Sequence, residues 1–268
     1  MKKSRVLIAC VVCAMTVLTT ACGGNNGNSS NTSVGTNSST PAQSSAAGNT
    51  STNSSAVTSG NSTASVSSTP ESSVATSAAE STPANNTDLS HGTWSGKTYT
   101  SAFLGIKGEF PSDWVVTSDS DLASAIGATG MSADSMKTAL NSVGTVTEMK
   151  AATADQSSSV NIVIEDTNKT KTPNESDKYF STMPAVAQQQ LEAVGEALGV
   201  SMKANVSESS VSFLGEDTKC LYIILTVDGS DVHEIQVPIF KDNYVVNITF
   251  AAPTKAEAEA LVASFTKA

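Results

Sequence analysis

The chain has 268 residues, a formal net charge of −10 and 39% hydrophobic residues, a composition typical of a globular protein. Nucleic-acid binding needs a basic face that neutralises phosphates, so we exclude nucleic acid as a partner of so acidic a chain. Arg5 is the only arginine and lies in a segment that we expect to be removed, so the mature chain has no guanidinium group for binding the phosphates of a nucleotide.

The first 21 residues have the pattern of a bacterial secretory signal peptide. Lys2, Lys3 and Arg5 form a positively charged start, and an apolar stretch runs from Val6 to Leu18. This stretch is too short for a transmembrane helix, which needs roughly 20 apolar residues. Loss of residues 1–21 removes the three positive charges and changes the net charge from −10 to −13.

Residues 18–24, Leu-Thr-Thr-Ala-Cys-Gly-Gly, resemble the lipobox of bacterial lipoproteins, although Thr19 stands where leucine is usual. The resemblance implies transfer of a diacylglyceryl group to Cys22, cleavage before it, and palmitate-type acylation. A competing match ends at Cys10, but only six residues precede that match, too few for an export signal. Two acyl chains hold a protein stably at a membrane. We therefore expect a lipid-anchored protein on the extracytoplasmic face of the cell membrane, with a Gram-positive cell surface favoured.

Residues 22–90 read as the lipidated Cys22 followed by a disordered tether. The 68 residues from Gly23 to Ser90 are mostly Ser, Thr, Asn, Ala and Gly, with no aromatic residue. Such a segment cannot bury enough apolar surface to offset an ordering cost of roughly 1–2 kcal/mol per residue. Random-coil scaling places the domain on the order of 45 Å from its anchor.

We expect one globular domain in residues 91–268. Alternating apolar residues predict strands over Leu104–Phe110 and Val160–Ile164. Two short helices are expected between these strands, at Asp121–Ile126 and Ala133–Asn141.

A long helix is predicted over Asp177–Gly199, ending at a glycine that can adopt the left-handed conformation. Pro184 is expected to break or kink its start. The predicted apolar stripe consists of Ala187, Leu191, Val194 and Leu198.

The last third of the domain predicts a three-stranded meander and a helix. Cys220–Val227 is apolar on both faces, which predicts a central strand covered on both sides. Asp228-Gly229 forms a tight turn into a strand with Ile235–Ile239, and Tyr244–Phe250 is the next strand. Short loops favour antiparallel pairing. A capping box at Thr254–Glu257 begins a C-terminal helix that must pack on the sheet.

This order of elements, together with the turn Phe110-Pro111-Ser112-Asp113-Trp114, resembles the PsbP-like superfamily, which includes bacterial lipoproteins of the DcrB and LpqN type. The resemblance covers most of residues 98–268. It implies an α+β fold, an α/β/α sandwich with a central, mainly antiparallel sheet. Members bind different partners, and the resemblance transfers no catalytic residue.

Two residues are candidates for binding, each with a structural alternative. Trp114 follows a proline turn and would be a binding anchor if exposed, but a place at the end of the core is favoured. His233 alternates with the apolar residues of its strand, which favours a core or edge position over a catalytic or metal role. His91 lies at the tether junction, where we expect it to be too mobile to act as a base.

We expect no cofactor and no metal site. Cys220 begins an apolar strand and is expected to be an inert core thiol without a disulfide partner. Asp228–Asp231 and Asp166–Asp177 contain oxygen ligands suited to calcium, but neither has EF-hand spacing. Polar turns are the favoured interpretation, and a weak calcium site stays open.

The sequence supplies an export signal and a scaffold, without a recognised catalytic motif in the domain. We therefore expect a non-enzymatic binding or accessory domain for a protein partner. One alternative is a solute-capture lipoprotein, and another is a hydrolase that uses carboxylates outside known motifs. A deep pocket with converging polar groups would favour either alternative, whereas a concave apolar patch would favour a protein partner.

Overall fold

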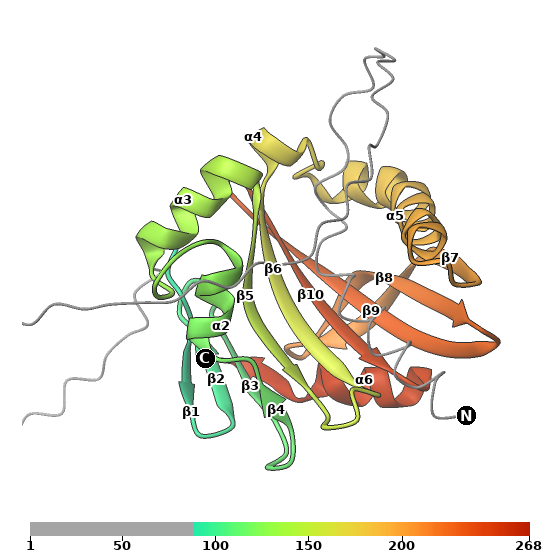
Figure 1. The fold of residues 1–268 in the computed structure, drawn as a ribbon, viewed down its shortest axis with the longest axis horizontal. Helices are drawn as coiled ribbons and strands as arrows, with labels where there is room; N and C mark the ends of the chain where they lie inside the picture. The colour runs from blue at the N-terminus through green and yellow to red at the C-terminus, as the bar shows by residue number, and fades with distance from the viewer. Residues whose placement is uncertain (1–87) are drawn as a thin grey trace, which may run out of the picture. The chain divides into compact units, whose positions relative to one another are not determined.

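The computed structural model describes residues 88–268. The predicted signal peptide, Cys22 and the tether up to residue 87 lie outside the described residues. The described chain has an α+β fold with two antiparallel sheets and helices on both faces of the larger sheet (Figure 1), which confirms the predicted fold class. Within this part of the chain, no helix combines the length and the apolar character needed to cross a bilayer.

The larger sheet has seven strands in the order β4-β5-β6-β10-β9-β8-β7, and each neighbouring pair is antiparallel. Its strands are β4 (Val115–Val116), β5 (Thr145–Ala152), β6 (Ser159–Asp166), β7 (Met202–Phe213), β8 (Glu216–Val227), β9 (Ser230–Lys241) and β10 (Tyr244–Ala252). The predicted meander is confirmed by the consecutive pairs β8–β9 and β9–β10.

A second, smaller sheet has the order β1-β2-β3-β11 and joins the beginning of the domain to its end. Its strands are β1 (Thr93–Ser95), β2 (Thr98–Ser101), β3 (Ile106–Glu109) and β11 (Phe265–Lys267). Only the β3 strand was expected from the sequence. The other strands are too short to show a clear alternation.

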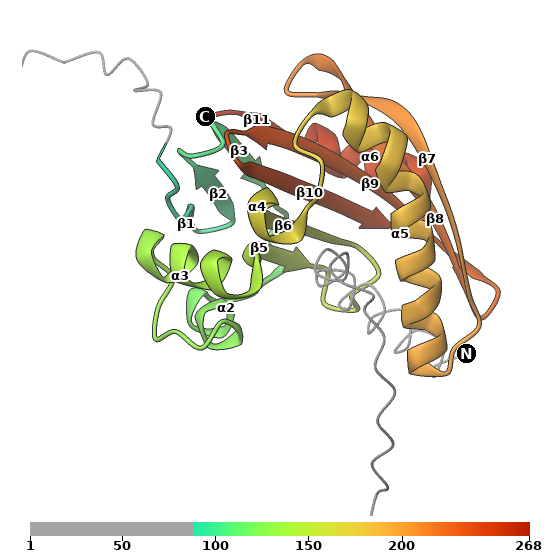
Figure 2. The ribbon, with the colours of Figure 1, turned by 90° about the horizontal axis from the view of Figure 1, so that it is seen from above.

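The helices cover the larger sheet from two sides, as Figure 2 shows from above. They are α2 (Asp119–Ala125), α3 (Ala133–Val143), α4 (Thr167–Thr170), α5 (Ser176–Leu198) and α6 (Lys255–Ala263). On one face, α5 packs Tyr179 and Phe180 against strand residues that include Leu221. On the other face, α3, α6 and the small sheet share a core that includes Ile162 and Phe250.

Two details of the predicted strands and turns can be compared with the structure. Asp228 and Gly229 both have positive φ, 50° and 81°, so the predicted tight turn is confirmed. The prediction that Cys220–Val227 is a central strand covered on both sides is confirmed in part, because β8 lies between β7 and β9, Leu221 packs on one face and Cys220 packs in the core of the other. β8 is next to the edge strand, so Leu221 is buried under α5 whereas Tyr222 on the other face is only half-buried.

The long helix differs from its prediction in two respects. α5 continues through Pro184 without a break, because its packing against the sheet outweighs the loss of one backbone donor. Leu198, expected in the apolar stripe, is 51% exposed. The close contact at this end of the helix is made by Gly195, where an added Cβ would lie 2.5 Å from Cβ of Met202.

The core begins ahead of the expected domain start. Leu89 is only 4% exposed and packs in the same cluster as Tyr99 and Ile106. The range 91–268 therefore leaves out one residue of the core.

Candidate functional site

The first candidate is a buried carboxylate, Glu148, placed by an irregularity in β5. The pairing of β5 with β6 shifts register between Thr147 and Met149, as in a β-bulge. The bulge puts two consecutive residues, Glu148 and Met149, in the interior, where a regular strand would bury only every second one. The side chain of Glu148 is thereby directed toward the small sheet.

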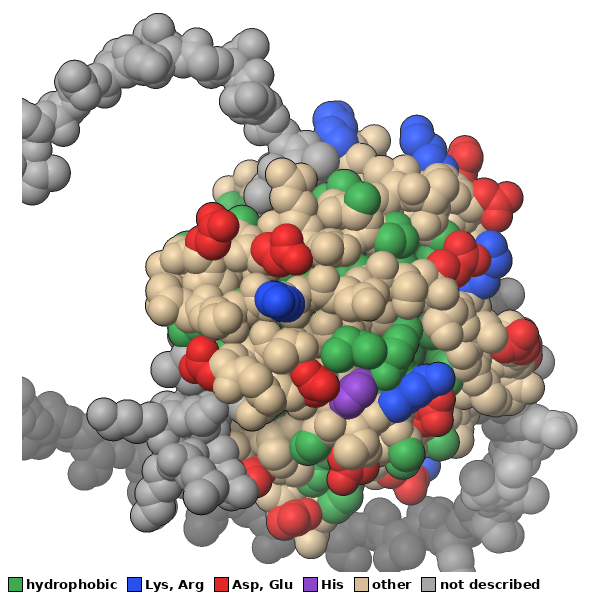
Figure 3. Space-filling view, turned by 90° about the vertical axis from the view of Figure 1, so that its right-hand side faces the viewer, with side chains coloured by type: hydrophobic (Ala, Val, Ile, Leu, Met, Phe, Trp, Pro, Cys, Tyr) green, Lys and Arg blue, Asp and Glu red, His purple; other side chains and the backbone are tan. Residues whose placement is uncertain are grey.

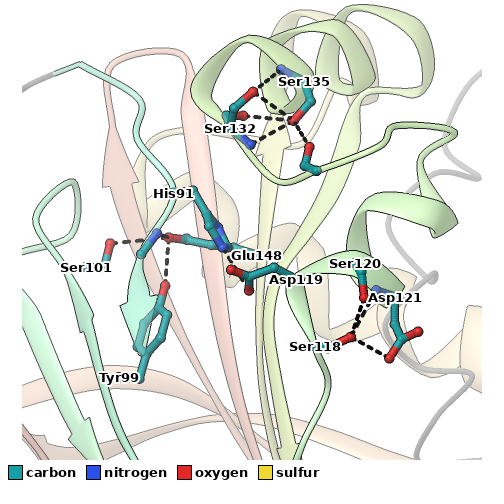
Figure 4. A network of polar contacts seen from close by, with 12 residues as sticks. His91, Tyr99, Ser101, Ser118, Asp119, Ser120, Asp121, Ser132, Ser135 and Glu148 are labelled. Atoms are coloured by element: carbon teal, nitrogen blue, oxygen red, sulfur yellow. Dashed lines mark hydrogen bonds and ion pairs between the residues drawn. The ribbon is translucent and has the colours of Figure 1, made fainter. Parts of the chain in front are cut away.

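Three donors converge on a single oxygen of this carboxylate (Figure 4). Oε1 of Glu148 accepts hydrogen bonds from the Tyr99 hydroxyl at 2.7 Å, the Gly92 N–H at 3.0 Å and the Ser101 hydroxyl at 3.3 Å. Burial raises the pKa of Glu148, and these donors oppose that rise because they stabilise the carboxylate. Burial and the adjacent carboxylate also raise the pKa of Tyr99.

His91 lies beside this network and is held in place, contrary to the expectation that it is mobile. Its side chain is 10% exposed, and Nε2 is 3.2 Å from Oδ1 of Asp119. This is a close contact between the imidazole ring and the carboxylate without hydrogen-bond geometry. Asp119 is the first residue of α2, and Ser118 caps that helix by accepting the N–H of Asp121. The cluster therefore fastens the beginning of the domain to β5 and α2.

A second buried network surrounds Glu165 on the opposite face of the sheet. Its Oε1 accepts a hydrogen bond from Nδ2 of Asn247 at 2.6 Å, and its Oε2 accepts one from the Thr172 hydroxyl at 2.8 Å. The Tyr179 hydroxyl donates to Oδ1 of Asn247 at 2.8 Å. Burial raises the pKa of Glu165 to about 7. The network connects β6, β10 and the start of α5.

A third glutamate, Glu234, is buried in β9, and burial raises its pKa to about 8. Its Cα is paired with Ile223 of β8 and Ala251 of β10, both of which are buried. The sequence analysis missed all three acids. The available signal in each case was a glutamate flanked by strand-forming residues.

The structure separates the two binding candidates. Trp114 is 5% exposed and packs against Phe110 with ring centroids 5.4 Å apart, so the favoured core interpretation is confirmed. His233 is half-buried, and its Nδ1 lies 2.7 Å from the hydroxyl of Tyr222, with the two rings stacked. Trp114 thus belongs to the core beside the small sheet, and His233 to the β8–β9 pair.

The expected inert thiol and the acidic loops also have defined positions. Cys220 is buried, and burial raises its pKa to about 11, which keeps the thiol protonated. Asp231 accepts a hydrogen bond from the Thr226 hydroxyl, and Asp166 accepts one from the N–H of Asn168 as the cap of α4. Within residues 88–268, no group of three or more histidine, cysteine or acidic residues is arranged to hold a metal ion.

An open cleft lies where the two sheets approach each other. It has a volume of about 780 Å³ and is bordered by the β7–β8 hairpin, the end of α6 and β11. Its lining residues are Ser210, Val211, Ser212, Leu214, Gly215, Asp217, Glu259, Ala263, Phe265, Thr266 and Lys267. Figure 3 shows the side of the domain on which α5, β7 and β8 lie, with small groups of hydrophobic side chains among acidic and basic ones.

No protein-family model matches this chain, and no curated protein matches it. The resemblance to the PsbP-like superfamily therefore stays a prediction.

Proposed function

We propose that the chain is a membrane-anchored extracytoplasmic lipoprotein, attached through lipid on Cys22, whose domain is a non-enzymatic binding or accessory domain for a protein partner. The lipobox-like residues 18–24 support the anchor. The long Ser/Thr/Asn-rich segment after them supports a tether that extends the domain away from the membrane.

The cleft of about 780 Å³ between the β7–β8 hairpin and β11 is the observation that supports binding. The acids with raised pKa, Glu148, Glu165 and Glu234, are not among its lining residues. Glu148 and Glu165 instead hold separate segments of the fold together through hydrogen bonds. This arrangement favours binding over hydrolysis by an acid–base pair of carboxylates.

Solute capture is the second candidate function, because the cleft volume falls in the range of small-ligand sites, roughly 300–1,000 Å³. The strand edges that border the cleft favour a peptide segment instead. Backbone N–H and C=O groups at a sheet edge recognise another extended chain.

Cell fractionation tests the anchor. Cys22→Ser should move the protein from the membrane fraction to the soluble extracytoplasmic fraction, because the lipid attachment is lost. Cys10→Ser is the matched control and should stay with the membrane. Release by Cys10→Ser, or retention of Cys22→Ser after a high-salt wash, would contradict lipidation at Cys22.

Cross-linking in intact cells tests the binding function. A photo-reactive amino acid is placed at Ser212 in the cleft in one variant and at the exposed Asp113 in a second variant. A specific protein partner should give a reproducible adduct with only one of these two variants. Equal, diffuse labelling at both positions would argue against a specific protein partner.

A further inference from the structure

The strand β7 forms a long edge of the larger sheet. Among the described residues it pairs with β8 alone, and the register runs without a shift from Met202 to Phe213. A regular edge of this kind offers a row of N–H and C=O groups to another extended chain. Ser209 to Phe213 includes no proline and no charged residue, which are features that commonly protect natural edges.

The turn that follows β7 determines which residues offer these groups. Its two residues, Leu214 and Gly215, have positive φ of 55° and 83°, as in a type I′ hairpin turn. The residues that flank such a turn form a hydrogen-bonded pair, and hydrogen-bonded and non-hydrogen-bonded pairs alternate along an antiparallel ladder. The N–H and C=O of Ser212 and Ser210 therefore point away from β8.

These two serines both line the cleft, so the cleft borders the edge of β7 at the residues whose backbone groups point away from β8. On the other side of the cleft lie Thr266 and Lys267 of β11, the last strand of the smaller sheet. Among the described residues, β11 pairs only with β3. An extended peptide in the cleft would thus lie beside two sheet edges.

The charged side chains of the cleft favour a cationic occupant. Nζ of Lys267 is 2.7 Å from Oε1 of Glu216, so its positive charge is already paired. Oε1 of Glu259 lies 3.4 Å from Nζ of Lys255 and is likewise paired, whereas Asp217 forms no ion pair with another described residue. The remaining negative charge suits a lysine or arginine side chain.

The chain's own tether does not supply that charge. Residues 23–87 contain no lysine and no arginine, and their only charged residues are Glu71 and Glu80. Charge complementarity therefore favours a segment of another protein.

We propose that the free edge of β7 at Ser210 and Ser212 binds an extended, lysine- or arginine-containing segment of a protein partner as an added β-strand. This inference rests on the proposed binding function and names its site and the chemistry of the partner. Backbone pairing supplies affinity, and the carboxylate of Asp217, which forms no ion pair with another described residue, selects a cationic side chain.

A model peptide tests the proposal with the full-length chain in detergent micelles. The probe is a fluorescein-labelled peptide of alternating lysine and valine, followed by fluorescence anisotropy, with a glutamate–valine peptide for comparison. We expect the lysine peptide to bind, with an affinity that falls as salt is raised. We expect the glutamate peptide not to bind.

Proline substitutions test the backbone pairing. Ser210→Pro/Ser212→Pro removes two outward N–H donors and should lower the affinity at least about tenfold, since each hydrogen bond contributes to binding. Ser210→Ala/Ser212→Ala is the matched control, because it removes the hydroxyls and keeps both donors, and its affinity should be unchanged. Edge strands tolerate proline where the N–H faces outward, so the proline variant should stay folded. Its thermal unfolding temperature, compared with that of the unchanged chain, checks that it does.

Charge substitutions give a second test that does not alter the backbone. Asp217→Asn should weaken binding several-fold and reduce its salt dependence, whereas Asp113→Asn, an exposed residue outside the cleft lining, should have no effect. Hydrogen exchange should show the amides of Ser210 and Ser212 protected only when the lysine peptide is bound.

Equal binding of the two peptides, or unchanged affinity after the proline substitutions, would overturn the proposal. Dimerisation without peptide that the proline substitutions abolish would overturn it and assign the edge to a second copy of the chain. Tighter peptide binding after removal of residues 23–87 would overturn it and assign the edge to the tether. A protein adduct at another surface, without peptide binding at the cleft, would leave the proposed function standing and reject this site. Absence of any specific adduct would reject both.

Discussion

At the scale of single residues, Glu148 shows how one buried carboxylate connects distant parts of the chain. Tyr99→Phe removes the hydroxyl that donates to Glu148 at 2.7 Å, so the free energy of unfolding should fall by about 1–2 kcal/mol. Chemical denaturation of the variant measures this loss. The matched control is Tyr244→Phe, whose lost hydroxyl makes no hydrogen bond to another described residue. Equal losses in the two variants would show that Glu148 does not depend on this donor.

Another residue-scale prediction follows from the raised pKa of Glu234, about 8 in the folded domain. Because the unfolded value is near 4.5, the folded state binds an extra proton between these values. The contribution of Glu234 to the free energy of unfolding is fully present below about pH 4.5 and is lost as the pH rises through about 8, a change of up to about 5 kcal/mol.

Glu234→Gln should remove the contribution of Glu234 and leave those of Glu165, whose pKa is raised to about 7, and of Glu148, whose pKa is also raised by burial. Denaturation curves at several pH values provide the measurement, with Glu196→Gln, an exposed residue of α5, as the control. An unchanged slope for Glu234→Gln would contradict the assignment.

At the scale of elements, α5 is placed by its contact with the start of β7. Replacing a helical glycine by alanine ordinarily stabilises a helix by about 1 kcal/mol. At Gly195 the added Cβ would lie 2.5 Å from Cβ of Met202, so overpacking should instead cost about 1–3 kcal/mol. Thermal unfolding of Gly195→Ala measures the sign. Gly130→Ala, with open space around the added Cβ, is the control and should be nearly neutral.

At the scale of the whole molecule, the small sheet and Leu89 determine where the stable domain begins. A chain that starts at Asp88 should unfold at a higher temperature than one that starts at His91, because burial of a leucine side chain contributes about 1.5–3 kcal/mol. Calorimetry of the two chains provides the comparison. Leu89→Ala in the full-length chain should reproduce most of the loss. Identical midpoints for the two chains would mean that Leu89 adds nothing to the core.

The sequence by itself determined the features that depend on local patterns. The left-handed stop at Gly199, the turn at Asp228-Gly229 and the cap at Thr254 follow from backbone preferences of a few residues. The meander and the α+β class follow from the spacing of apolar residues and the short loops between strands. The proposed lipid attachment at Cys22 also rests on a local motif, and it stays a prediction because Cys22 lies outside the described residues.

Only the tertiary structure decided what depends on contacts between distant segments. Register in a sheet is a property of two strands, so the bulge that turns Glu148 inward could not be read from β5 alone. The packing of α5 explains why the helix continues through Pro184 and why Leu198 is exposed. The cleft likewise exists because β11 returns to β3 beside the end of β7, more than 50 residues away along the chain.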